Sequence, residues 1–145
     1  MDHENILLVE GIDDLHLIAH LLKHYGHEGM IHIEKRDGIS KLLKSLRTFL
    51  KDDSIKRLGI IVDANTVLLT RWQAIRNRLM ASGTVMLPDL PNAEGTIATI
   101  DQGYRKLRVG VWLMPDNQSP YNRKRILRDN WCQREMTFGI KRNLM

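Results

Sequence analysis

The sequence has little cysteine and no long apolar run, and both absences narrow the classes of protein that it can represent. Cys132 is the only cysteine among 145 residues, which excludes a disulfide within one chain and a metal site built from several cysteines. No apolar stretch approaches the roughly 20 residues that a membrane-spanning helix needs. Residues 1–4 are polar and acidic, unlike the start of a signal peptide. We therefore expect a protein of a reducing, cytoplasmic compartment, without membrane contact.

The charge of the chain is concentrated at its C-terminal end. Residues 118–145 hold seven basic and two acidic side chains, which account for the whole formal net charge of +5. Residues 1–117 carry fifteen of each sign and are neutral overall. A basic tail can hold the phosphates of a nucleic acid, and it can equally be a solvated terminal segment. Nucleic acid is thus one candidate partner, and residues 118–145 form a tail distinct from the domain.

Apolar runs alternate with helical periodicity along the first 117 residues. Residues 5–9 and 58–62 are continuous apolar runs, which is typical of strands buried on both faces of a parallel sheet. Leu42, Leu46 and Leu50 recur at helical spacing. The remaining pattern predicts helices at 13–25, 39–51 and 67–81, strands at 30–33 and 109–114, and a loop with a short hairpin in 84–103.

The order of these elements predicts the fold class. Strands that alternate with helices favour right-handed crossovers and a mainly parallel sheet. We expect one α/β domain over residues 1–117, a compact Rossmann-type sheet of about four mainly parallel strands with helices on both faces.

Acidic and amide side chains follow three of the predicted strands. Glu10 and Asp14 come after the first, Asp63 and Asn65 after the central strand, and Asp116 after the last. In open α/β sheets, ligands bind at the carboxyl ends of the strands. Clustered carboxylates repel one another unless a cation lies among them, and oxygen ligands suit Mg²⁺ or Mn²⁺. The alternative is structural, since Asp63, Asn65 and Thr66 could simply cap the next helix.

These turns resemble those of the Toprim domain, the fold shared by topoisomerases, bacterial primases and the OLD-type nucleases. The resemblance covers about residues 5–117 and is carried by Val9-Glu10-Gly11, an acid four residues after Glu10, and Ile61-Val62-Asp63-Ala64-Asn65. A small group of standalone Toprim-like proteins is similar also in Thr70-Arg71-Trp72 and in residues 110–117, Gly-Val-Trp-Leu-Met-Pro-Asp-Asn.

The resemblance implies a compact parallel sheet and a Mg²⁺-dependent phosphotransfer site. It gives Glu10 the role of general acid/base or metal ligand, and it makes Asp14, Asp63 and Asn65 metal ligands. Toprim enzymes usually carry Asp where this chain has Asn65, so one negative charge is absent here.

The chain also departs from the standalone group after residue 117. Where those proteins continue with Gly and an acidic Glu-Asp-Phe helix, this sequence continues with Gln118 and soon turns basic. We hypothesise a truncated or frameshifted gene end, which the other reading frames downstream of codon 117 would reveal. The residues of the tail that could contact nucleic acid are Arg123, Lys124, Arg125 and Arg128.

Three further features have a plain structural interpretation beside a functional one. His16, His20 and His24 recur every four residues, a spacing that can bind Zn²⁺, but they lie opposite the apolar stripe and suit a solvated face. Trp131, between basic residues, could stack on a base, whereas Trp72 and Trp112 lie in core patterns. Cys132 has no visible catalytic partner.

Two functions therefore stay open. The first is a Mg²⁺- or Mn²⁺-dependent nuclease or related phosphotransfer domain that acts on nucleic acid through Glu10, Asp14, Asp63, Asn65 and Asp116. The second is a catalytically degenerate Toprim-fold module, as a homodimer or bound to a partner protein. Asn65 and the missing acidic helix favour the second, and the clustered acids favour the first.

Overall fold

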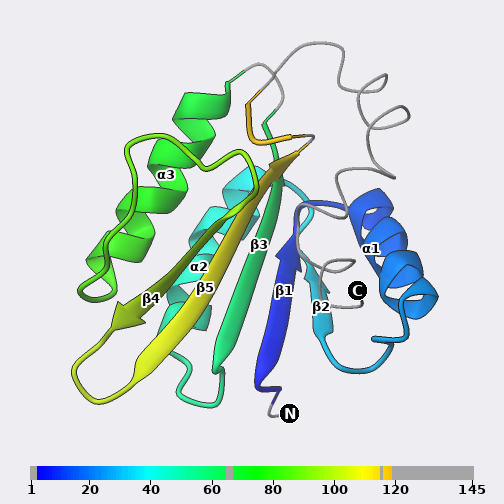
Figure 1. Ribbon diagram of the computed structural model, residues 1–145, viewed down its shortest axis with the longest axis horizontal. Helices are drawn as coiled ribbons and strands as arrows, with labels where there is room; N and C mark the ends of the chain where they lie inside the picture. The colour runs from blue at the N-terminus through cyan, green and yellow to red at the C-terminus, as the bar shows by residue number, and fades with distance from the viewer. Residues whose placement is uncertain (1–2, 65–66, 115, 119–145) are drawn as a thin grey trace.

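The computed structural model describes residues 3–64, 67–114 and 116–118. Within these ranges the chain forms a five-stranded sheet of order β2-β1-β3-β5-β4 and three helices (Figure 1). The elements are β1 (Asn5–Val9), α1 (Ile12–His24), β2 (His32–Lys35), α2 (Ile39–Lys51), β3 (Arg57–Asp63), α3 (Leu68–Ala81), β4 (Thr96–Asp101) and β5 (Lys106–Met114).

The sheet is mainly parallel, which confirms the predicted α/β class. β1 pairs in parallel with β2 and β3, and β3 pairs in parallel with β5. Only β4 runs the other way, as the antiparallel partner of β5. The strands alternate with α1, α2 and α3 up to β4, a Rossmann-like arrangement.

Four of the strands are parallel, in line with the prediction of about four, and residues 84–103, predicted as a loop with a short hairpin, add β4 as a fifth strand. β4 has one buried and one exposed face: Ile100 is buried whereas Ile97 is 63% exposed. β5 also begins three residues earlier than predicted, at Lys106. Its first residues alternate between exposed cations and buried Leu107 and Val109, a period of two that a search for continuous apolar runs misses.

The second strand is shifted relative to the prediction of 30–33. β2 covers His32–Lys35, and Met30, which was included in the predicted strand, is 60% exposed. β2 has only β1 as a neighbour and so lies at an edge of the sheet. Charged side chains are common on edge strands, where they discourage pairing with other chains.

Two apolar clusters cover the two faces of the sheet, as the alternation of elements predicted. On one face the buried leucines of α2 (Leu42, Leu46, Leu50) and the buried face of α3 pack against β1, β3 and β5. On the other face α1 packs through Ile18, Leu21 and Leu22. Figure 1 shows α1 beside β1 and β2, away from β4.

The end of α1 is fixed by Gly26. This glycine has φ = +76°, the left-handed region that side chains with a Cβ rarely adopt. Its N–H donates to the carbonyl of Lys23, and the His27 N–H donates to the carbonyl of Leu22, the pair of bonds that closes many helices. The chain is thereby turned back toward β2.

The parallel strands bring Glu10, Asp63 and Asp116 to one edge of the sheet. Glu10 follows β1, Asp63 ends β3 and Asp116 follows β5, and these three strands are consecutive neighbours. We call this side of the sheet, at which the parallel strands end, the carboxyl edge. No helix in the described residues has both the length and the apolar character needed to cross a membrane.

Candidate functional site

Glu10 links two strand ends at the carboxyl edge. Its Oε1 accepts a hydrogen bond of 3.1 Å from the backbone N–H of Asp63. Both side chains are partly buried. The predicted proximity of the first and central strand ends is therefore present as a direct contact.

The carboxyl group of Glu10 has a raised pKa. Burial is the largest cause, because it penalises the charged form. The Asp63 N–H bond lowers the pKa, the negative charges of Asp63 and Asp14 raise it, and the positive charge of Arg71 lowers it. The net direction means that negative charge at Glu10 is not fully compensated by its surroundings.

Asp14 belongs to the same group of charges and also caps a helix. Its Oδ2 accepts a hydrogen bond of 3.2 Å from the N–H of Gly11, the residue that precedes α1. A carboxylate in the first turn also complements the positive end of the helix dipole. The neighbouring Asp13 is exposed. The structure thus places Glu10, Asp14 and Asp63 together, with Asp14 serving the backbone through one oxygen.

Arg71 is the residue of this site that the sequence analysis did not assign. It lies in the first turn of α3, and its charge acts on Glu10. Its Nε is buried and has no hydrogen-bond partner within the described residues. A cation near the N-terminus of a helix is disfavoured by the helix dipole. That unfavourable position was the sequence signal that could have identified Arg71.

Asp116 lies at the same edge but is engaged locally. It is 8% exposed, and its Oδ1 accepts a hydrogen bond of 3.0 Å from the N–H of Gln118. The adjacent Asn117 is 2% exposed and has φ = +64°. Its Oδ1 accepts from the Leu113 N–H at 2.7 Å, and its Nδ2 donates to the Ala93 carbonyl at 3.2 Å. Asn117 therefore fixes the turn that carries Asp116.

The donor set suits a hard cation in its chemistry, since Glu10, Asp14, Asp63 and Asp116 all offer oxygen. Among the described residues, however, no three His, Cys, Asp or Glu side chains are gathered so that they could hold a metal ion. The predicted ligand Asn65 lies outside the described residues. So do the tail residues Arg123, Lys124, Arg125, Arg128, Trp131 and Cys132.

A hollow of about 660 Å³ lies at the beginning of α3. Residues 67–70 form one side, Leu90 and Pro91 another, and Asn117 with Gln118 complete it. It adjoins the turn that follows β5, so it offers space for a ligand next to the carboxyl edge.

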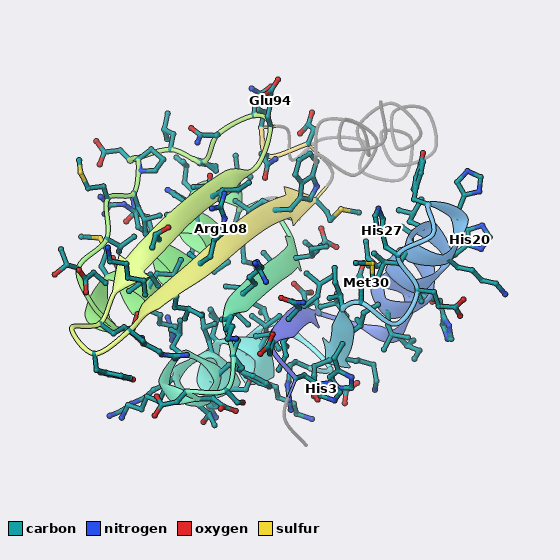
Figure 2. All side chains as sticks on the ribbon, turned by 60° about the horizontal axis from the view of Figure 1, so that its bottom comes forward. His3, His20, His27, Met30, Glu94 and Arg108 are labelled. Carbon is teal, nitrogen blue, oxygen red and sulfur yellow. The ribbon has the colours of Figure 1, made fainter. Side chains whose placement is uncertain are left out.

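The histidines of α1 form a solvated face, in agreement with the structural interpretation. His16, His20 and His24 are exposed, and Figure 2 shows His20 directed away from the sheet. Trp72 and Trp112 are 0% and 2% exposed, as predicted for core residues. The Nε1 of Trp72 donates to the Asp89 carbonyl at 2.9 Å.

Comparison with known proteins identifies a family. A family model described as "Protein of unknown function (DUF3226)" matches residues 4–122. No curated protein and no solved structure matches the chain.

Proposed function

The chain belongs to the DUF3226 family, and we propose that it is a Toprim-like, Mg²⁺-dependent phosphotransfer domain of nuclease type that acts on nucleic acid. The observation that carries this proposal is the partly buried carboxylate of Glu10 beside Asp63 and Asp14, with a raised pKa. The charges of Asp63, Asp14 and Arg71 all act on Glu10, and a divalent cation bound among these acids would relieve their mutual repulsion.

The proposed roles follow from the position of each side chain. Asp63 and Asp14 would be metal ligands, joined by Asp116 and by the amide oxygen of Asn65. Glu10, whose pKa is raised, would act as the general acid/base, because a raised carboxyl pKa brings proton exchange closer to neutral pH. A bound Mg²⁺ or Mn²⁺ would polarise the phosphodiester.

Arg71 would contact the phosphate rather than the metal. A guanidinium binds phosphate oxygens through paired N–H donors, and the charge of Arg71 already acts on Glu10. The hollow at the start of α3 would receive the adjoining nucleotide. The basic side chains Arg123, Lys124, Arg125 and Arg128 would add contacts to the nucleic acid backbone.

The test is calorimetric titration of Mg²⁺ and Mn²⁺ into the full chain and into two matched variants. Asp63→Ala removes a proposed ligand, whereas Asp13→Ala removes an exposed acid of the same helix turn that also holds Asp14. We expect binding by the wild type and by Asp13→Ala, and its loss in Asp63→Ala.

Metal-dependent cleavage of labelled DNA or RNA would then be measured with the same three proteins. No binding to the wild type at millimolar metal would remove the enzymatic proposal. Equal weakening in both variants would mean that the ions only screen negative charge and occupy no site.

A second candidate is a degenerate Toprim-fold module without catalysis, acting as a homodimer or with a partner protein. It is favoured by the absence, among the described residues, of three acidic or histidine side chains arranged for a metal. Asn65 in place of an acid favours it too. Light scattering with size-exclusion chromatography would detect the dimer, and unchanged dimerisation in Asp63→Ala would separate it from metal binding.

A further inference from the structure

A second hollow, of about 730 Å³, lies at the other end of the strands from the carboxyl edge. It is formed by the second half of α2, the end of α3 and the turn between β4 and β5. Its volume lies within the ~300–1,000 Å³ of small-molecule sites. We call it the basic pocket; its lining is Leu43, Lys44, Arg47, Leu50, Lys51, Arg78, Ala81, Ser82, Gln102 and Tyr104.

The charged side chains of the basic pocket are all positive. Lys44, Arg47, Lys51 and Arg78 line it, and no carboxylate does. Within the described part of the chain, none of these four cations forms an ion pair. Lys51 and Arg78 lie in the last turns of their helices, where the dipole favours a cation. The helix dipole does not account for Lys44 and Arg47, which lie earlier in α2.

One guanidinium of the pocket is held in place by the backbone. The Nε of Arg78 donates to the Leu43 carbonyl at 3.2 Å, and its Nη1 donates to the Ala74 carbonyl at 2.9 Å. The bond to Leu43 ties α3 to α2, and the two bonds together fix the orientation of the guanidinium. Binding an anion to an arginine that is already oriented costs less side-chain entropy than ordering a free one.

The floor of the pocket is also fixed. The Nε2 of Gln102 donates to the Leu50 carbonyl at 2.9 Å, and its Oε1 accepts from Arg105 at 2.7 Å. Arg105 in turn donates to the carbonyl of Leu50. The polar groups between α2 and the β4–β5 turn are therefore paired among themselves, which leaves the cations at the rim to face a ligand.

The pocket offers an apolar surface beside its cations. Leu43, Leu50 and Ala81 contribute aliphatic surface. Tyr104 is 67% exposed, although a ring of this size is usually more covered. An exposed ring beside aliphatic side chains and arginines is a surface on which a nucleobase can stack.

We propose that the basic pocket binds a nucleoside phosphate. Its phosphate would lie against Arg78, Arg47, Lys44 and Lys51, and its base on Tyr104 and the aliphatic floor. This site is separate from the carboxyl edge and needs no metal ion.

The test is to measure by calorimetry the binding of adenosine monophosphate to the full chain in the presence of EDTA. Arg47→Gln combined with Lys51→Gln removes two cations of the pocket. Lys41→Gln combined with Arg108→Gln removes two exposed cations that do not line it; Figure 2 shows Arg108 on the sheet. We expect the pocket variant to bind about tenfold more weakly or worse, and the control variant to bind as the wild type does. Thermal melts would verify that both variants are folded.

Titrations with other ligands test the roles proposed for the phosphate and for the base. Weaker binding of adenosine and of inorganic phosphate than of the nucleotide would support it. Inorganic phosphate that binds as tightly as the nucleotide would overturn the role of the base. An eight-nucleotide strand that binds a hundredfold tighter would overturn a small ligand in favour of a polymer. No binding of the nucleotide at 10 mM, or equal weakening in both variants, would overturn the site itself.

Retained binding in Asp63→Ala would keep this proposal independent of the phosphotransfer proposal. Tyr104→Leu is the complementary variant, because it keeps the apolar floor but removes the ring. It should weaken nucleotide binding and leave the binding of inorganic phosphate unchanged.

Discussion

The carboxyl edge and the basic pocket lie at opposite ends of the strands of one sheet and carry opposite charges. Glu10, Asp14 and Asp63 gather at the first, whereas four cations and no carboxylate line the second. Residues 1–117 are nevertheless neutral in total. A neutral sum here comes from separated charges, so net charge alone predicts neither of the two ligand classes.

The two regions also differ in how the chain builds them. The acids follow the ends of strands, which a parallel sheet brings to one edge. The cations of the pocket come from the surfaces of two helices that meet only after folding. On the sequence, such helix surfaces look like ordinary solvated faces.

The largest expected effect is at the carboxyl edge, in Asn117→Ala. The change leaves the buried Leu113 N–H without its side-chain acceptor and removes the bond to Ala93. Alanine also tolerates φ = +64° less well than asparagine does. We expect a loss of about 2–4 kcal/mol in the free energy of unfolding, measured by urea denaturation.

Asn117→Gly separates the two causes of this loss. Glycine accepts the positive φ but makes no side-chain bond, so it should lose less stability than alanine does. Equal losses in the two variants would mean that the backbone conformation contributes nothing.

The next largest loss of stability is expected beside the basic pocket, in Gly83→Ala. A Cβ on Gly83 would lie 2.6 Å from the Asp101 carbonyl oxygen and 2.8 Å from Cγ2 of Ile100. That carbonyl also accepts the Thr84 N–H at 2.8 Å, so backbone must move. We expect a loss of about 1–3 kcal/mol, again from urea denaturation, together with weaker nucleotide binding in the adjoining pocket.

Gly110→Ala is the matched control for this change. No atom lies within 4 Å of a Cβ built on Gly110, and a glycine inside a strand is unfavourable. The control should be neutral or slightly stabilised. A comparable loss in both variants would show that contact with β4 is not the cause.

The smallest effect is a gain, in Glu10→Gln. Because burial and the neighbouring acids raise the pKa of Glu10, its ionised form opposes folding at neutral pH. The amide keeps an oxygen that can accept the Asp63 N–H. We expect the variant to have a Tm about 1–3 °C higher than the wild type at pH 7.

The pH dependence gives the sign of this effect. In the wild type, folding favours the protonated carboxyl, so stability falls as pH rises from the ordinary pKa of 4.5 through the raised value. The advantage of Glu10→Gln should therefore shrink as the pH falls below 4.5. Parallel melting curves at pH 4 and pH 7 measure it, and an advantage independent of pH would contradict the electrostatic cause.

The fold could be predicted from the sequence where one local pattern dominates. Residues 5–9 and 58–62 are continuous apolar runs, and they are β1 and most of β3. The helix predicted at 39–51 is α2 to the residue. β4 was predicted only as part of a loop with a short hairpin, because prolines and glycines surround its six residues; its pairing with β5 was not predicted.

The candidate site could be predicted only in part. The positions of the strand ends predicted that Glu10 and Asp63 lie close together, and the Asp63 N–H donates a hydrogen bond of 3.1 Å to Oε1 of Glu10. The sequence shows that Arg71 stands at an unfavourable position near the start of a helix, but its influence on Glu10 depends on the tertiary structure and could not be predicted. Neither could the engagement of Asp14 by the Gly11 N–H, which is a matter of local helix geometry.

The antiparallel β4–β5 pair has a consequence for the order in which the molecule folds. Its partners are close in sequence, so their loop closes at little entropic cost, whereas β1 must meet β3 across the whole segment that contains β2 and α2. The hairpin can therefore form early, whereas the β1–β3 and β3–β5 pairings both need long loops to close. Since Glu10 follows β1 and Asp63 ends β3, the two acids come together only after one of these long-range pairings has formed.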